Sequence, residues 1–248
     1  MKKRYPHKYM QNFVTEELNI KCDNNFLRCY LFGKRKTGKG TILFCPGTSS
    51  VHKEHLDLIG ILASEFNLIL VIFRGQGKNT GKYSTHNALV DMGVIINTIE
   101  KYDFVDPNRI GIYGMCNGGV IAVFHASYDT RIKTLCLWET NPEYDWKDHN
   151  FIKKRFNKYK NKGIAVDPFS YWIAYNPIDV IHRVSCKTLV CGGDTEERVR
   201  VKEMKKMYSK LPNGKFKIIE NAPHYVGKKH PKFLEYSDMI LNWFRREF

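Results

Sequence analysis

The sequence predicts an α/β fold in which helices cover both faces of a mostly parallel central sheet. Short, continuously apolar runs such as 68–73 are typical of strands that are buried on both faces. These runs alternate with longer stretches of helical periodicity, as in chains that build a parallel sheet. A chain of 248 residues can bury one large core, so we expect a single domain over 1–248.

The expected elements begin with two paired strands at 13–20 and 26–32, joined by a turn at 23–25. Apolar strands follow at 41–45, 68–73, 109–113, 132–138, 187–191 and 216–219. Helical spacing predicts helices at 52–66, 88–102, 118–128, 199–211 and 231–248. Pro231 suits the first turn of the last helix, where its missing N–H costs nothing.

One segment interrupts this alternation. At about 141–185 the chain shows no clear strand, and a connection of that length inside a compact domain is usually functional. We therefore expect a lid or cap insertion here. Its aromatic residues suit an apolar acyl channel, and its basic residues include Lys153, Lys154, Arg155 and Lys158. The alternative is a helical decoration whose lysines only face solvent.

Composition limits the partners and the compartment. The formal charge of +15 favours an anionic substrate or an acidic partner protein, although a generally basic surface is the plainer explanation. No nucleic-acid-binding motif accompanies the charge, and no apolar run is long enough for a membrane span. Seven Cys without metal-binding spacing, and no secretory signal, predict reduced thiols in the cytoplasm with no metal or other cofactor.

The most informative motif surrounds Cys116. The apolar run 109–113 leads into Gly114-Met115-Cys116-Asn117-Gly118-Gly119, and a helix of small residues follows. Small residues on both sides of a nucleophile allow a sharp strand-to-helix turn. The helix N-terminus behind Cys116 favours a thiolate and presents backbone N–H groups to an oxyanion. The alternative is a buried structural Cys in a glycine-rich turn.

Three further polar segments follow predicted strands, and the carboxyl ends of parallel strands meet at one edge of a sheet. Thr48 follows the strand at 41–45, Asp194 and Glu196 follow the strand at 187–191, and His224 follows the strand at 216–219. The chain order is therefore nucleophile, acid and histidine.

With these motifs the chain resembles the α/β-hydrolase superfamily. The resemblance is carried by 46–48, by Phe73-Arg74-Gly75-Gln76-Gly77, by the turn around Cys116 and by the loops at 192–199 and 221–225. It implies that Cys116 is the nucleophile and His224 the general base. It also implies that the backbone N–H groups of Thr48 and Asn117 form the oxyanion hole.

The acid that the resemblance implies has two candidates. The family pattern after the strand at 187–191 fits the register of Gly193 and Val199 and nominates Glu196. Asp194 lies two residues earlier and is the commoner residue type for this role. Either carboxylate could instead be an ordinary solvated loop residue.

A Cys nucleophile favours thioesters, activated esters or lactones, because its acyl-enzyme is itself a thioester. Cysteine at this position is found in dienelactone-hydrolase-like enzymes and in some thioesterases. We expect an acyl hydrolase or acyltransferase that acts on a small acyl substrate, free or attached to an acidic carrier protein. The alternatives are a catalytically inactive binding module of the same fold and a basic surface-binding protein.

Overall fold

The computed structural model describes residues 14–47, 53–143, 149–161, 163–167, 175–195 and 201–248. Its centre is an eight-stranded sheet with the order β1-β2-β4-β3-β5-β6-β7-β8. The strands are β1 (Val14–Cys22), β2 (Asn25–Phe32), β3 (Thr41–Cys45), β4 (Asn67–Leu70), β5 (Ile110–Met115), β6 (Ile132–Trp138), β7 (Lys187–Gly193) and β8 (Gly214–Ile219).

Strand pairing follows the prediction of a mostly parallel sheet. The hairpin β1–β2 is antiparallel and joins β4 in antiparallel pairing, whereas all other neighbours pair in parallel. The parallel strands β3 and β5 lie in the middle of the sheet, and every residue of both strands is buried. This explains why their sequences are almost continuously apolar.

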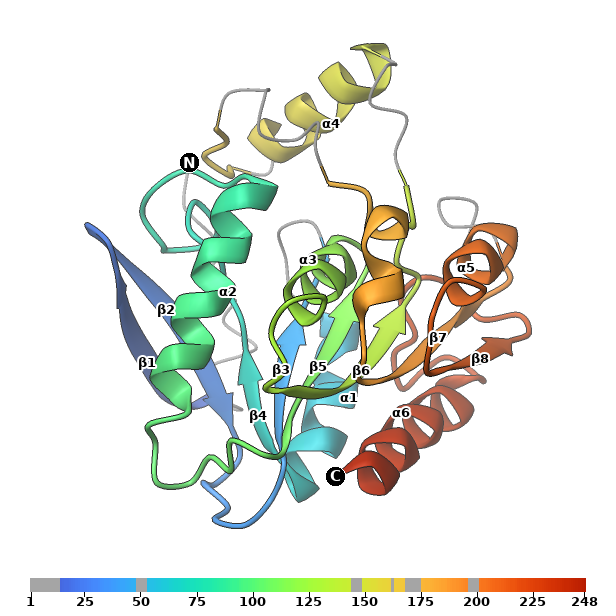
Figure 1. Ribbon diagram of the computed structural model, residues 1–248, viewed down its shortest axis with the longest axis horizontal. Coiled ribbons are helices and arrows are strands. Elements are labelled where there is room, and N and C mark those ends of the chain that lie inside the picture. The colour runs from blue at the N-terminus through green and yellow to red at the C-terminus, as the bar shows by residue number, and fades with distance from the viewer. Residues whose placement is uncertain (1–13, 48–52, 144–148, 162, 168–174, 196–200) are drawn as a thin grey trace.

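Helices cover both faces of the sheet (Figure 1). One face carries α2 (Thr85–Ile99), α3 (Asn117–Ala126) and α5 (Val201–Tyr208), and the other carries α1 (Lys53–Glu65) and α6 (Phe233–Glu247). The core is divided accordingly into two apolar clusters, one on each side of the sheet. This layered arrangement is the α/β-hydrolase fold expected from the sequence.

The structure differs from the predicted strand at 68–73. The strand β4 ends at Leu70, although Val71, Ile72 and Phe73 remain buried. The N–H of Val71 still donates to the carbonyl of Phe44, but the chain then bends into a turn closed by the Gln76 N–H and the Phe73 carbonyl. The apolar run in the sequence is therefore longer than the strand, because residues 71–73 are buried without continuing the strand.

Buried charges hold this turn in place. The Arg74 guanidinium donates to Asp91 of α2 over 2.6 Å, and the Arg74 backbone N–H donates to the same carboxylate over 2.8 Å. The Asp91 side chain is completely buried, and that of Arg74 is 10% exposed. Burial raises the pKa of Asp91, although hydrogen bonds and charge interactions with Arg74 oppose the shift.

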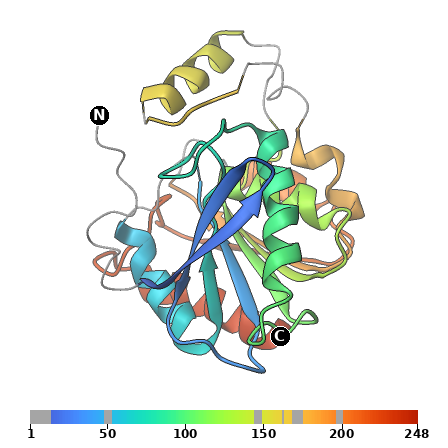
Figure 2. The same cartoon turned by 90° about the vertical axis from the view of Figure 1, so that its left-hand side faces the viewer.

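Between β6 and β7 lie α4 (His149–Asn161) and two short 3-10 turns, η3 (Pro177–Asp179) and η4 (Ile181–Arg183). The helix α4 lies beyond the ends of the strands, at one edge of the layered body, as Figures 1 and 2 show. Residues 163–167 return to the body, where Val166 forms a parallel bridge with Tyr83. In the described part of the chain, every helix is too short or too polar to cross a lipid bilayer.

Candidate active site

The nucleophile position is a sharp turn between β5 and α3. Cys116 is the N-cap of α3 and has φ 53° and ψ −117°, a backbone conformation that L-residues rarely adopt. The turn needs glycine at two positions: a Cβ on Gly118 would lie 2.0 Å from the Cys45 carbonyl oxygen, and one on Gly119 would lie 1.8 Å from Thr140 Oγ1. The turn therefore presents a partly exposed Cys116 at the helix N-terminus, as the sequence predicted.

His224 reaches the same place from the loop after β8. Its side chain is 4% exposed, and its ring is hydrogen-bonded to Cys116. Trp138, the last residue of β6, holds both partners through separate bonds. Its carbonyl accepts the Cys116 N–H over 3.0 Å, and its indole N–H donates to the His224 carbonyl over 3.1 Å.

The carboxylate that contacts His224 is Glu139, the residue directly after β6. Its Oε2 is hydrogen-bonded to His224 Nδ1, and its Oε1 accepts the Gly193 N–H over 3.0 Å. Glu139 is completely buried and has φ 45°, so the chain is again held in an unusual conformation. Because Nδ1 is engaged by Glu139, Nε2 of the ring is left to face the thiol.

The sequence nominated Glu196 for this role, with Asp194 as the alternative, and did not point to Glu139. Asp194 is exposed, and its Oδ1 accepts the Asn221 backbone N–H over 2.7 Å, so it braces the loop that carries His224. Glu196, the other candidate, lies outside the described residues. The sequence feature that could have identified Glu139 is its place directly after the strand at 132–138, at the same sheet edge as Cys116.

The electrostatics of the three side chains are coupled. Burial of the His224 ring lowers its pKa, but hydrogen bonds and charge interactions with Cys116 and Glu139 outweigh this effect. The result is a pKa of about 9, compared with an ordinary value of 6.5. The site therefore favours a protonated imidazole.

The other six Cys have different surroundings. Five of them are buried, and Cys186 is partly buried. Burial raises the pKa of the Cys29 thiol to about 12 and that of the Cys186 thiol to about 11. Thiols of this kind are poor nucleophiles at neutral pH, which leaves Cys116 as the candidate for reaction.

Backbone N–H groups for an oxyanion are expected around the helix N-terminus. Asn117 is the first residue of α3 and is 7% exposed. Gly47 lies on the opposite side of Cys116 and packs closely against it. A Cβ on Gly47 would lie 3.2 Å from Cβ of Cys116. Thr48, the second predicted donor, lies outside the described residues.

Among the described residues between β6 and β7, Tyr159 contacts the site. The hydroxyl of Tyr159 in α4 is hydrogen-bonded to the Asn117 side-chain amide, and its ring stacks on Tyr83 at 5.6 Å. Tyr159 is completely buried, whereas Lys153 and Lys154 of the same helix are exposed. The side chains of Arg155 and Lys158 are outside the described part of the structure.

Within the described part of the chain, His, Cys, Asp and Glu side chains form no cluster of three or more that could hold a metal ion. What the site offers is a thiol, an imidazole and a carboxylate in one hydrogen-bonded chain. This set is sufficient for covalent acyl transfer.

One known protein family matches the part of the chain that contains this site. The model of the prolyl oligopeptidase family matches residues 82–248, which include Cys116, Glu139 and His224. The match begins in the loop before α2 and runs to the end of the chain.

Solved structures match nearly the whole chain. DcsB, solved with its substrate analogue, superposes with a TM-score of 0.77 at 16% identity, over 94% of this chain and 99% of that one. The α/β hydrolase GrgF from Penicillium sp. sh18 gives a TM-score of 0.76 at 12% identity, over 94% and 97% of the two chains. The Pyrococcus furiosus esterase Pf2001 gives 0.75 at 18% identity, over 95% and 92%. At these identities the likeness concerns the fold.

Proposed function

The chain belongs to the prolyl oligopeptidase family of α/β hydrolases, and from that premise we propose that it is a cysteine-dependent acyl hydrolase or acyltransferase for ester or thioester bonds. The observation that carries the proposal is the hydrogen-bonded series Cys116, His224 and Glu139 at the carboxyl ends of the strands. A catalytically inactive relative would not need to keep three such groups in contact. Their contact therefore supports an enzyme over a binding module.

In the first step the Cys116 thiolate attacks the acyl carbon and forms a tetrahedral intermediate. The carbonyl oxygen gains negative charge beside the Asn117 N–H and the helix N-terminus. The intermediate collapses by breaking the bond to the leaving group, and the His224 imidazolium donates its proton to that group. The products are an alcohol or thiol and a thioester on Cys116.

In the second step water, an alcohol or an amine attacks this thioester. His224, now neutral, accepts the proton of the attacking group, and the bond to Sγ breaks to restore the thiolate and the imidazolium. Glu139 keeps Nδ1 protonated throughout and stabilises the charged ring. The Gly193 N–H holds the second oxygen of Glu139, so the carboxylate is fixed before the reaction begins.

The choice of thioesters or activated esters follows from the nucleophile. A thiolate is a better leaving group than an amide nitrogen, so attack on an unactivated amide tends to reverse. Exchange between two thioesters is nearly balanced in energy. The family match itself favours peptide-bond hydrolysis as a second candidate, so a peptide belongs in any substrate panel.

We also propose that the segment at about 141–185 covers this site as a lid. Support comes from the contact between Tyr159 and Asn117 and from the return of the chain at Val166. The exposed Lys153 and Lys154 would face an anionic donor such as an acidic carrier protein. In the cytoplasm, where we expect the protein, the Cys116 thiol would stay reduced.

The test is a comparison of kcat/KM for a panel of acyl thioesters, esters and peptides. We expect Cys116→Ala to abolish turnover and His224→Ala to lower kcat/KM by about 10²–10⁴-fold. Glu139→Gln should cost at least about tenfold, because its amide favours the wrong tautomer of the imidazole. Asp194→Asn is the matched control and should cost less than about threefold.

Two outcomes would count against the proposal. Full activity of Cys116→Ala would remove the nucleophile. A larger loss in Asp194→Asn or Glu196→Gln than in Glu139→Gln would move the acid role back to the loop after β7.

A further inference from the structure

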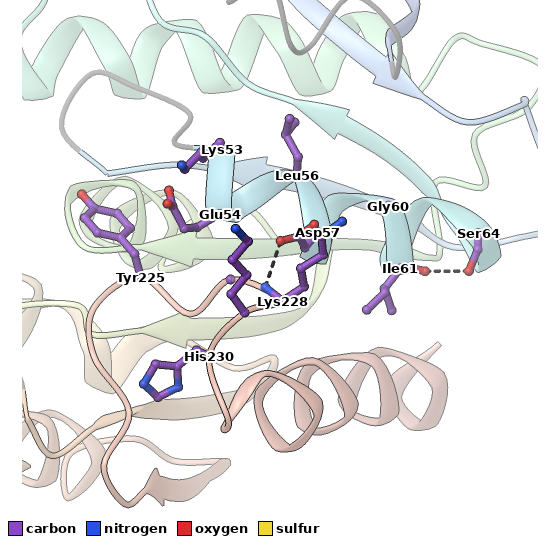
Figure 3. A pocket seen from close by; sticks show the side chains of 12 residues that line it. Lys53, Glu54, Leu56, Asp57, Gly60, Ile61, Ser64, Tyr225, Lys228 and His230 are labelled. Carbon is purple, nitrogen blue, oxygen red and sulfur yellow. Dashed lines mark hydrogen bonds between the residues drawn. The ribbon is translucent and has the colours of Figure 1, made fainter.

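A large groove lies between α1 and the loop that follows His224 (Figure 3). Its volume is about 880 Å³, which is within the range of small-molecule binding sites. The outer face of α1 forms one wall, from Lys53 to Ser64, and residues 225–230 form the other. At 1.5 Å per residue the wall on α1 is about 16 Å long, so the groove suits an extended ligand.

One end of the groove lies next to His224 in the chain. Tyr225, which lines it, directly follows His224, and the two rings lie 4.7 Å apart. The Tyr225 ring also lies 5.5 Å from that of His55 in α1. His55 Nε2 in turn lies 3.1 Å from Sδ of Met115, the residue before Cys116. Both walls of the groove are therefore tied to the elements that carry the proposed triad.

A glycine inside α1 keeps the groove open. Gly60 lines the groove in the middle of a 13-residue helix, where glycine is less stable than alanine. No heavy atom lies within 4 Å of the position that its Cβ would take, so packing does not require glycine there. A larger side chain at this position would project into the groove.

The lining combines apolar and cationic groups. Leu56, Ile61 and Tyr225 supply the apolar surface, and the three lysines on the rim are Lys53, Lys228 and Lys229. Two carboxylates also line the groove. Asp57 accepts the backbone N–H of Lys228 over 2.9 Å, and Glu54 lies against Gly227. Three lysines against two carboxylates, in a chain of charge +15, favour an anionic ligand.

From this arrangement we infer that the groove holds the leaving-group arm of the acyl donor, and that this arm is extended and ends in a phosphate. The inference rests on the proposed function, because it assigns the thiol side of a thioester. The acyl carbon would lie at Cys116, and the arm would enter the groove at Tyr225 and run along α1 past Asp57 toward Gly60, where its phosphate would meet Lys228 and Lys229. The thiol would leave along the same groove.

The experiment compares two donors with the same acyl group, the thioester of N-acetylcysteamine and that of coenzyme A. The first is short and neutral, and the second carries an extended arm with phosphates. We expect Gly60→Leu and the double variant Lys228→Gln/Lys229→Gln to raise KM for the coenzyme A thioester at least tenfold. Both variants should keep kcat/KM for the neutral thioester within twofold. Gly60→Ala is the folding control for the helix and should bind both donors like the wild type.

A second measurement needs no turnover. Free coenzyme A should bind to the Cys116→Ala protein, and the affinity should fall at least tenfold in Lys228→Gln/Lys229→Gln and with rising salt. Undetectable binding, or equal effects of the variants on both thioesters, would overturn the assignment of the groove. Acylation of Cys116 by the neutral thioester reports on the proposed function separately, so the two proposals can fail independently.

Discussion

The indole N–H of Trp138 donates to the His224 carbonyl, while the Trp138 carbonyl accepts the Cys116 N–H. One residue at the end of β6 thus fixes the backbone of both Cys116 and His224. Glu139, the next residue, bonds the histidine ring. The geometry of the site therefore depends on where β6 ends.

This relationship makes Trp138 a positioning residue. We expect Trp138→Phe to lower kcat about tenfold and to change KM little, because the histidine loop loses one anchor while the substrate groups stay in place. Steady-state kinetics with a thioester would show it. Tyr236, whose ring contacts Trp138 at 4.6 Å, provides the comparison: Tyr236→Phe keeps the ring contact and should retain wild-type kcat. Equal losses in both variants would indicate a general packing defect.

The contact between Tyr159 and Asn117 predicts a second effect. Tyr159→Phe keeps the stacking on Tyr83 but leaves the buried Asn117 amide with one hydrogen bond fewer. Such a loss costs about 1–3 kcal/mol of folding stability, and because Asn117 begins α3 next to Cys116, we expect kcat/KM to fall by about fivefold. The melting temperature, measured in parallel, should change by only a few degrees. Unchanged kinetics would mean that α4 does not support the oxyanion side of the site.

The pKa of His224 predicts how turnover depends on pH. Because the pKa is raised to about 9, the ring keeps its proton up to that pH and then loses it. An ester needs this proton for its leaving alkoxide, whereas a thiolate leaves without it. We expect ester turnover to fall above about pH 9 and thioester turnover to fall much less, as measured by kcat at each pH.

The same shift has a consequence for stability. A ring whose pKa is higher in the folded than in the unfolded chain stabilises the fold fully below pH 6.5, and this contribution disappears as the pH rises through about 9. Urea unfolding of the wild type and of His224→Gln should therefore converge at high pH. A difference that grows above pH 9 would contradict the raised pKa.

The buried ion pair of Arg74 and Asp91 predicts a large effect on folding. Asp91→Asn leaves the mostly buried Arg74 charge with the exposed Asp23 as its acidic partner, and we expect a loss of about 3–5 kcal/mol in the free energy of unfolding. The exposed pair of Arg35 and Glu16 is the control, and Glu16→Gln should cost less than about 1 kcal/mol. Chemical denaturation of both variants tests the difference.

The sequence was sufficient to predict the fold, and it nominated two of the three side chains that the structure places in contact. Continuous apolar strands predicted the parallel sheet, and the glycines around Cys116 predicted a turn that the structure shows to be sterically necessary. The loop of His224 was found because it follows an apolar strand. In each case the signal is local in the sequence.

Glu139 was missed for a physical reason. A carboxylate can reach the histidine from the end of either β6 or β7, because the two strands are neighbours and end at the same edge. Which carboxylate contacts His224 depends on the backbone of Glu139, with φ 45°, and on the hydrogen bond from the Gly193 N–H. Neither is visible in the sequence. The shortened β4 has a similar origin, since burial alone does not define strand pairing.

The most direct test of the account is the intact mass of the protein after brief incubation with an acyl thioester, followed by peptide mapping. The account predicts one added acyl group, located on Cys116, which is absent in Cys116→Ala and which accumulates when deacylation is slowed in His224→Ala. An acyl group on another residue, or turnover of the thioester without any trace of an adduct on Cys116, would contradict it.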